Sequence, residues 1–389
     1  MLERIFGRDE TYFQKHDALT TSTEIAQQPR LWRELVGLLR QQEEEITTFV
    51  DKMKAISGLR IIFTGAGSSA FVGQALQMMF ARENGLRGEA IATTDIVSVP
   101  DCVLYDAPTL LVSFSRSGES PESLAALEYA AKRIRNLYNL VVVCKKGSTL
   151  ANYAAHETDT LLLNMPPESS DAGFAMTSSV SCMALGTYCV FNWERRNEVM
   201  EHIERLADYV EAEMHSMDRF ALDVVKFDYR RLIYLGSGAL RGLAQEGAVK
   251  SLELTNGKIN SSSDSPMAFR HGPKTVVNSH TLTVHFISPD SLTSKYDLDV
   301  LKELAREKTQ NRQLALVTEG VVVPEGVDYA LHSAISGGVF AELSVYIVNL
   351  VFLQLLSLEK SIATGTPTDN PSVGGEVNRV VRGVTIYEL

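Results

Sequence analysis

The sequence has few cysteines and no cluster of basic residues, and these absences exclude several classes of protein. Its four cysteines are scattered without a CxxC pair, so the sequence predicts neither a zinc knuckle nor a disulfide scaffold. We expect reduced, buried thiols in a cytoplasmic protein instead. The net charge of −11 and the lack of a Lys/Arg run argue against nucleic-acid binding, because contact with a phosphate backbone depends on clustered cations.

Long apolar segments are also scarce. The N-terminal stretch MLERIFGRDETYFQ is charged throughout, so no signal peptide is expected. The most apolar stretch is LSVYIVNLVFLQLLSL, residues 343–358, which contains Asn349 and Gln354. It is shorter than the roughly 20 apolar residues that cross a bilayer. We therefore expect a buried or subunit-interface helix, and no membrane partner.

The apolar pattern predicts an α/β fold. Residues 24–56 have apolar positions at helical spacing, interrupted at Pro29, which indicates an N-terminal helical segment. Residues 59–76, LRIIFTGAGSSAFVGQAL, follow as a buried strand, a glycine-rich turn and a helix. Apolar runs return at 109–114 and 139–144 with an amphipathic helix between them. Strands that alternate with helices form a parallel sheet.

The same pattern occurs a second time. Residues 230–254, RRLIYLGSGALRGLAQEGAVKSLEL, again give a strand, a glycine turn and a helix. The charged stretch 192–217 between the two copies reads as a connecting helix. Two such copies in 389 residues predict two related domains. We place the helical lead-in at 1–56 and the two domains at 57–215 and 216–389.

Serines and glycines gather where two of the predicted strands end. TGAGSSA (64–70) and SFSRSGES (113–120) should both lie at the carboxyl edge of the first sheet, where ligands of open α/β sheets bind. Small residues, hydroxyl groups and the start of a helix suit a phosphate. The alternatives are a tight βα connection for the first segment and a turn capped by serines for the second.

These motifs resemble a known family. TGAGSSA with SFSRSGES looks like the phosphosugar-binding signature of sugar isomerase (SIS) domains, and the layout resembles the isomerase half of glucosamine-6-phosphate synthase. The segments at 93–97, 173–179, 264–274 and 377–384 are most similar to the bacterial galactosamine-6-phosphate deaminase/isomerase group, also called tagatose-6-phosphate ketose/aldose isomerases. The resemblance implies two tandem SIS domains. It also implies that the sugar phosphate is bound by Ser68, Ser69, Ser115, Ser117, Ser120 and the backbone N–H of Arg116.

The second domain holds the candidate acid–base residues. Glu246, Lys250 and Glu253 have the spacing of one helical face. An exposed Glu–Lys pair explains the spacing equally well. The resemblance implies instead that Glu253 moves a proton between C1 and C2 of the sugar, that Glu246 lies in the same site, and that Lys250 contacts the substrate.

A histidine lies in the loop FRHGPK. His271 precedes a Gly-Pro turn, and a loop histidine is often only solvated, although imidazole suits proton transfer near neutral pH. The resemblance implies that His271 opens the sugar ring and serves the active site of a neighbouring subunit. A homodimer, or a dimer of dimers, is therefore expected. The other histidines are scattered, so we expect no metal and no other cofactor.

One position departs from the synthase. Where the synthase tail has a lysine that forms a Schiff base, this sequence has Arg382, and a guanidinium cannot form that imine. We expect Arg382 to contact the substrate. The sequence starts with Met1-Leu2, and a glutaminase domain with its N-terminal cysteine is not expected.

The sequence thus predicts a cytoplasmic enzyme that converts an amino-sugar 6-phosphate, with galactosamine 6-phosphate as the first choice, into tagatose 6-phosphate and ammonia. Such a reaction belongs to amino-sugar catabolism and includes a hydrolytic step. A ketose/aldose isomerase that acts without deamination is the main alternative, followed by a lyase or deglycase. A SIS protein that only senses sugar phosphates is the alternative outside the enzymes.

Overall fold

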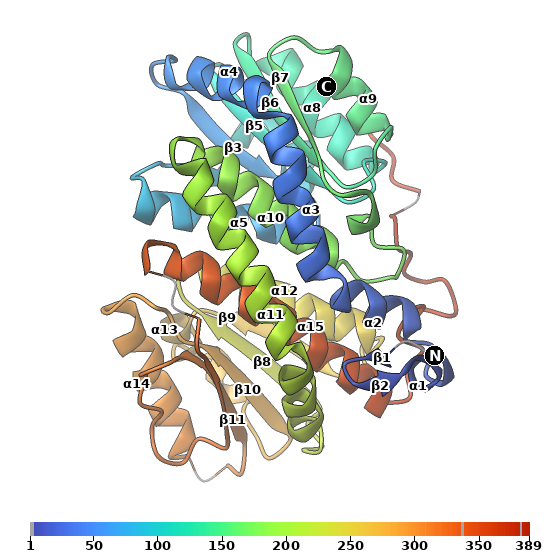
Figure 1. Ribbon diagram of the computed structural model, residues 1–389, viewed down its shortest axis with the longest axis vertical. Coiled ribbons are helices and arrows are strands. Elements are labelled where there is room, and N and C mark those ends of the chain that lie inside the picture. The colour runs from blue at the N-terminus through green and yellow to red at the C-terminus, as the bar shows by residue number, and fades with distance from the viewer. Residues whose placement is uncertain (1–3, 308, 336–337, 382) are drawn as a thin grey trace. The chain divides into compact units, whose positions relative to one another are not determined.

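The computed structural model describes residues 4–307, 309–335, 338–381 and 383–389 (Figure 1). The chain forms two compact units. The N-sheet unit contains the described residues of Gln27–Ala172, Met176–Ala207 and Gly375–Leu389, and the C-sheet unit contains those of Met1–Ala26, Gly173–Ala175 and Asp208–Gly374. Each unit is built around one parallel sheet with helices, which confirms the predicted α/β class.

The N-terminal segment is helical, as predicted. A short hairpin precedes four helices, and Pro29 occupies the first turn of α3, where its missing N–H costs no helical hydrogen bond. The domain boundaries predicted after residues 56 and 215 concern the sequence repeat, and they remain a proposal. The compact units are defined by contacts instead, and their divisions include those after Ala26 and Ala207. The elements are β1 Arg4–Ile5, β2 Arg8–Asp9, α1 Glu10–Lys15, α2 Leu19–Ala26, α3 Gln28–Gln41 and α4 Glu43–Lys54.

The N-sheet unit holds five parallel strands in the order β4-β3-β5-β6-β7. Every residue of the central strand β5 is buried, because helices cover both faces of such a sheet. The strands are β3 Arg60–Thr64, β4 Glu89–Ala90, β5 Thr109–Ser115, β6 Leu137–Val143 and β7 Thr160–Asn164. The helices are α5 Ser68–Glu83, α6 Thr93–Ser98, α7 Pro100–Val103, α8 Pro121–Arg133, α9 Thr149–His156 and α10 Ser178–Phe191.

The C-sheet unit repeats this plan with the parallel order β12-β11-β10-β8-β9. The second strand pattern of the sequence therefore forms a second sheet of the same topology. The strands are β8 Arg231–Gly236, β9 Asn260–Asp264, β10 Thr281–Phe286, β11 Arg312–Thr318 and β12 Tyr329–Ser333. The helices are α12 Ala239–Leu254, α13 Pro266–Phe269, α14 Thr293–Ala305 and α15 Ala341–Ala363.

The two glycine turns have the same backbone geometry. Gly67, which precedes α5, has φ 56° and ψ −128°, and Gly238, which precedes α12, has φ 58° and ψ −126°. This conformation strongly favours glycine. In each turn the earlier glycine passes close to the next helix: a Cβ at Gly65 would lie 2.7 Å from Ser69, and one at Gly236 would lie 2.2 Å from the carbonyl oxygen of Leu240. The repeat seen in the sequence is thus a repeat in structure.

The apolar stretch 343–358 forms most of α15, and the structure favours the buried alternative. Among the described residues, Gly338–Ala363 is the one helical segment that is long and apolar enough to cross a membrane, and 89% of its apolar window is buried. Asn349 and Gln354 are buried with it. Helix α15 packs on α12, and the hydroxyl groups of Ser251 and Ser357 lie 3.1 Å apart.

Two further predictions have clear outcomes. The charged stretch 192–217 lies mostly in α11, Arg196–Val224, the helix in which the chain passes from one unit to the other. Cys144, Cys182 and Cys189 are buried free thiols, as expected, but Cys102 is exposed, so the prediction was wrong for that residue. Cys102 lies on the short helix α7, none of whose four residues is buried.

Candidate active site

The predicted phosphate-binding serines lie at the carboxyl edge of the first sheet. Ser68 and Ser69 begin α5, directly after β3, and Ser115 ends β5. Strands β3 and β5 are parallel neighbours with Thr64 opposite Ser113, so their following turns emerge at the same edge. The structure therefore brings the TGAGSSA turn together with the serine loop, which we define as residues 115–120.

The serine loop is fixed by its own hydrogen bonds. The hydroxyl of Ser115 accepts from the N–H of Gly118 at 2.9 Å, and that of Ser117 accepts from the N–H of Glu119 at 3.2 Å. Ser120 precedes α8 and donates to Glu122 at 2.6 Å. Gly118 has φ 62°, and a Cβ there would lie 2.1 Å from the hydroxyl of Ser148. The loop is thus preshaped, with hydroxyl groups at the start of a helix, as an anion site requires.

Buried hydroxyl groups lie at the same edge. Those of Thr64, Thr93 and Ser113 are buried and have no hydrogen-bond partner among the described residues. Buried hydroxyl groups are nearly always satisfied in folded proteins, so partners supplied by a ligand or by water would complete this edge. Ser113 belongs to the predicted serine-rich motif, whereas no role was predicted for Thr64 or Thr93. Both could have been found from their position, since Thr64 is the first residue of TGAGSSA and the N–H of Thr93 donates to the carbonyl of Gly65 at 2.9 Å.

Arg116 has a second partner that the sequence did not predict. Its side chain is buried, and its guanidinium donates to the carbonyl of Arg379 at 2.9 Å. The guanidinium of Arg379 donates in turn to the carbonyl of Asp171, and the hydroxyl of Tyr129 donates to the carbonyl of Tyr387. The described residues of the C-terminal tail, 375–381 and 383–389, thus belong to the N-sheet unit and are bonded to it. Arg382 lies outside the described residues.

The three charged residues of α12 share one face, as their spacing predicted. The ammonium of Lys250 lies 2.6 Å from a carboxylate oxygen of Glu253 and 3.5 Å from one of Glu246. The side chains of Lys250 and Glu246 are fully buried, whereas that of Glu253 is 31% exposed. An exposed Glu–Lys pair, the alternative kept open above, does not describe this arrangement. The charge of Glu246 also acts on α15, where burial and this carboxylate raise the pKa of Tyr346.

His271 stands in an exposed loop of the C-sheet unit. The loop follows α13, and the N–H of His271 donates to the carbonyl of Ala268 at 2.9 Å. Gly272 has φ 123°, a conformation that an L-residue rarely adopts. Among the described residues, no hydrogen bond or ion pair joins the His271 side chain to α12. The serine loop belongs to the N-sheet unit, and α12 and His271 belong to the C-sheet unit.

A carboxylate from α14 contacts the corresponding turn of the second sheet. The buried side chain of Asp297, on α14, accepts from the hydroxyl of Ser237 at 2.5 Å and from the N–H of Ser288 at 3.0 Å. Ser237 lies in the glycine turn after β8, and Ser288 follows β10. A protein carboxylate thus takes the hydrogen bonds that a bound anion would take here. Asp297 was not predicted from the sequence, because it lies on a helix remote in sequence from the glycine motif.

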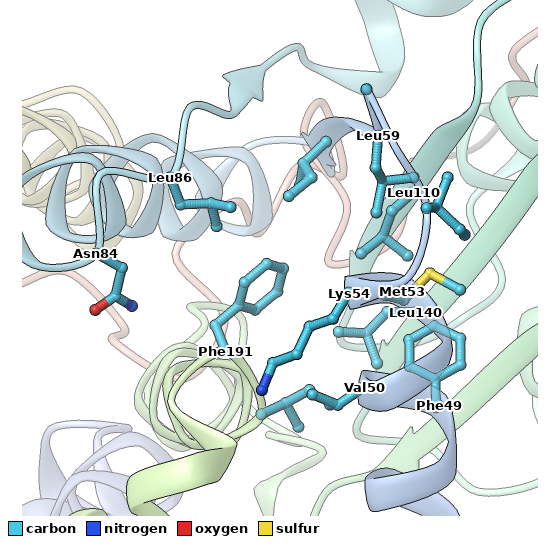
Figure 2. Close-up of a pocket in the computed structure, with 14 residues that line it drawn as sticks. Phe49, Val50, Met53, Lys54, Leu59, Asn84, Leu86, Leu110, Leu140 and Phe191 are labelled. Atoms are coloured by element: carbon cyan, nitrogen blue, oxygen red, sulfur yellow. The ribbon is translucent and has the colours of Figure 1, made fainter.

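A separate apolar pocket of about 420 Å³ lies in the N-sheet unit (Figure 2). Its wall includes Leu59 just before β3, Leu110 near the start of β5, and Phe191 at the end of α10. Among its described lining residues, Lys54 is the one cationic side chain, and it is paired with Glu194. None of the predicted site residues that the structure describes lines the pocket, and its apolar wall is unsuited to a sugar phosphate. Among the described residues, no group of three or more His, Cys, Asp or Glu side chains could hold a metal ion.

Comparison with known proteins places these features in context. Residues 56–190 match the family described as SIS domain. The D-galactosamine-6-phosphate deaminase AgaS of Shewanella sp. is 37% identical over 385 residues, which cover 96% of this chain and 93% of that protein. The crystal structure of tagatose-6-phosphate ketose/aldose isomerase from Escherichia coli superposes with a TM-score of 0.87 at 35% identity, over 95% of this chain and 96% of that one.

A more distant structure shares the fold. The C-terminal domain of glucosamine-fructose-6-phosphate aminotransferase from Francisella tularensis has a TM-score of 0.74 at 21% identity. The match covers 90% of this chain and 97% of that domain. Both sheets therefore have counterparts in one continuous domain of another protein.

Proposed function

We propose, because the chain belongs to the family of SIS-domain galactosamine-6-phosphate deaminases, that it converts D-galactosamine 6-phosphate into tagatose 6-phosphate and ammonia. The family membership confirms the predicted resemblance. The observation that carries the proposal is the charged group on α12, where a partly exposed carboxylate, Glu253, is hydrogen-bonded to the buried ammonium of Lys250. A carboxylate in this setting can take and return a proton without being freely solvated.

The serine loop supports binding of the phosphate. Ser68, Ser69, Ser115, Ser117 and Ser120 supply hydroxyl groups at the starts of α5 and α8, where helix dipoles favour an anion. The backbone N–H of Arg116 adds a donor, while its side chain is held by the tail. We propose that this loop binds the phosphate and takes no part in the chemical steps. A fixed phosphate orients C1 and C2, and orientation can supply a large part of a rate enhancement.

The proposed reaction moves one proton and consumes one water. His271 assists opening of the sugar ring to the aldehyde. Glu253 removes the C2 proton while O1 takes a proton from solvent, which gives an enolamine, and Glu253 then returns its proton to C1. The nitrogen at C2 is then a protonated imine. Water adds to C2, the C–N bond breaks, and ketose 6-phosphate and ammonia leave.

The roles of Lys250 and Glu246 follow from their burial. The ammonium of Lys250 lies between the two carboxylates, and we assign to it contact with the bound sugar beside Glu253. Glu246 balances that ammonium in the protein interior. Arg382 is proposed to contact the substrate, and as a guanidinium it cannot form an imine. The nitrogen released as ammonia must then come from the substrate.

A second candidate function rests on a specific observation. The Escherichia coli structure that covers nearly all of this chain is described as a ketose/aldose isomerase. The same proton shift between C1 and C2, applied to a sugar with a hydroxyl at C2, would interconvert an aldose and a ketose phosphate without loss of ammonia. A protein that only senses sugar phosphates is less favoured, because it needs no acid–base group.

We also propose that the protein is a cytoplasmic homodimer in which His271 serves the active site of the partner subunit. The exposure of His271 and the lack of a bond between its side chain and α12 among the described residues support this assignment.

The reaction is tested with purified protein and three substrates, the 6-phosphates of galactosamine, glucosamine and tagatose. We expect ammonia and ketose phosphate in equal amounts, fastest from galactosamine 6-phosphate. Glu253→Gln should abolish both products. Absence of ammonia from both amino sugars, with interconversion of unaminated sugars, would replace the deaminase by the isomerase.

A further inference from the structure

The loop that carries His271 is tied to α14 by one carboxylate. Glu303 accepts from the guanidinium of Arg270 at 2.8 Å through one oxygen and from the ammonium of Lys274 through the other. Arg270 directly precedes His271, and Lys274 follows it by three residues. The two oxygens of Glu303 therefore hold the loop on both sides of the histidine.

Apolar contacts fix the ends of the same loop. Phe269 is buried in a cluster with residues of β8 and α14, and Val276 and Val277 pack against this cluster. Between these anchors His271 is exposed and Gly272 has its unusual positive φ. A short loop with a permissive glycine next to its functional residue needs added constraints if that residue is to keep one position.

The ion pairs that Glu303 makes with Arg270 and Lys274 keep their charges near neutral pH. The hydrogen bond from Lys274, with a smaller contribution from Arg270, lowers the pKa of Glu303. Hydrogen bonds to Glu303 and Glu307 raise the pKa of Lys274. Glu303 is therefore ionised and Lys274 is protonated throughout the range in which an imidazole titrates.

We propose that Glu303 is a positioning residue for His271. By holding Arg270 and Lys274 together it fixes the direction of the imidazole, and without it the two cations repel each other across the loop. The kinetic consequence rests on the proposed function, in which His271 opens the sugar ring. The structural consequence, a loop ordered by Glu303, does not depend on which reaction the protein catalyses.

The structural consequence is tested by hydrogen exchange followed by mass spectrometry, with Glu303→Ala, Glu303→Gln and Glu307→Ala. Glu307 is the matched control, because it pairs with Lys274 and not with Arg270. We expect Glu303→Ala to speed exchange at least about tenfold in peptides covering 268–277, with α12 unchanged. Glu303→Gln, which keeps an acceptor, should give an intermediate effect, and Glu307→Ala a small one. Unchanged exchange in Glu303→Ala, or an equal effect in Glu307→Ala, overturns the proposal.

The kinetic consequence is tested with the same variants and a double mutant. Glu303→Ala should lower kcat on the amino-sugar phosphate by about 10- to 100-fold, the range expected when a reacting group is misplaced by about 1 Å. KM should change less than about threefold, because the phosphate is bound by another loop. Added to His271→Ala, the change should lower kcat less than about twofold, since no positioned imidazole remains.

The two tests separate two failures. If the wild-type protein releases no ammonia but Glu303→Ala still loosens residues 268–277, the proposed function fails and the loop assignment stands. If the wild-type protein is active and Glu303→Ala lowers kcat equally with and without His271, Glu303 does not act through the histidine and the positioning role is wrong.

Discussion

The ammonium of Lys250 lies 2.6 Å from a carboxylate oxygen of Glu253, and both residues project from the same face of α12. Lys250 is one of the largest fully buried side chains of the protein. Its charge is matched in the interior by Glu246, whose carboxylate lies 3.5 Å away. This buried ion pair brings two charges out of water, which is seldom favourable for stability alone. Its position beside Glu253 suits acid–base chemistry.

The first prediction concerns the stability of this group. Lys250→Met should lower the free energy of unfolding by about 3 to 5 kcal/mol, because Glu246 would keep its burial and lose the neighbouring ammonium. Glu253→Gln should cost much less, since that side chain reaches solvent. Urea unfolding followed by circular dichroism measures both. Equal stability of Lys250→Met and the wild type would mean that Glu246 becomes protonated at little cost.

A second prediction addresses the serine loop. Ser117→Ala should raise KM about 10- to 100-fold and leave kcat nearly unchanged, because a hydrogen bond to a charged group contributes about 1.5 to 3 kcal/mol. Thr149→Val is the matched control: its hydroxyl donates to Glu119 of the same loop at 2.6 Å but is not among the predicted phosphate contacts. KM and kcat of both variants are measured by steady-state kinetics. An unchanged KM for Ser117→Ala would show that the loop is not part of the binding site.

A third prediction comes from Arg8, whose guanidinium bridges two buried carboxylates. It lies 2.6 Å from Asp218 and 2.7 Å from Glu359. Burial and the negative charge of Glu359 raise the pKa of Asp218 to about 8, against the opposing effect of Arg8. The folded state therefore binds more protons than the unfolded state between the ordinary aspartate pKa, about 4, and about 8. Stability should fall as pH rises through this window.

The measurement is the melting temperature between pH 5 and pH 8.5. In Asp218→Asn the decline with pH should be shallower than in the wild type, because the titrating group is gone. Asp223→Asn is the control, since Asp223 lies on the same helix and pairs with Lys226 in an exposed position. A decline of the same slope in all three proteins would show that Asp218 does not titrate in this range.

The sequence predicted the central strands of both sheets, because these strands are buried on both faces and read as continuous apolar runs. In the second sheet the runs LTVHFIS (282–288) and QLALVT (313–318) predict strands in addition to the one in 230–254. The misses of the sequence prediction lie at the sheet edges. Strand β9, Asn-Ser-Ser-Ser-Asp, has no apolar residue, and β4 has two residues. An edge strand has only one neighbour and needs less apolar surface, so its sequence carries little signal.

For the site, the pattern of the sequence predicted which residues share a helix face but not their surroundings. The spacing of Glu246, Lys250 and Glu253 was sufficient to place them together. The burial of Lys250 depends on the elements that pack against α12, among them α15. Local spacing in the sequence does not report such tertiary packing. The bond between Arg116 and the carbonyl of Arg379 joins residues 263 positions apart, and no local pattern indicates such a contact.

A fourth prediction tests the shared active site. Glu253→Gln should be inactive and His271→Ala should keep only a low residual activity, and a mixture of the two after subunit exchange should recover activity, because one of the two sites in a mixed dimer would be intact. The recovered activity should approach a quarter of the wild-type value at full exchange. Exchange is verified by mass spectrometry with one isotope-labelled parent. No recovery in a verified mixed dimer would place His271 in its own subunit's site.

The last prediction tests the source of the nitrogen. If the substrate supplies it, no lysine of the protein forms an imine with the sugar, in keeping with the arginine at position 382. Borohydride added during turnover should then leave the mass of the chain unchanged, while ammonia and ketose phosphate appear together. Glu253→Gln should stop both at once, because each depends on the same proton shift. A sugar adduct on Lys250 or Lys274 would establish a covalent route. Ketose formation from an unaminated aldose phosphate at the same rate as from the amino sugar would make the isomerase the main activity.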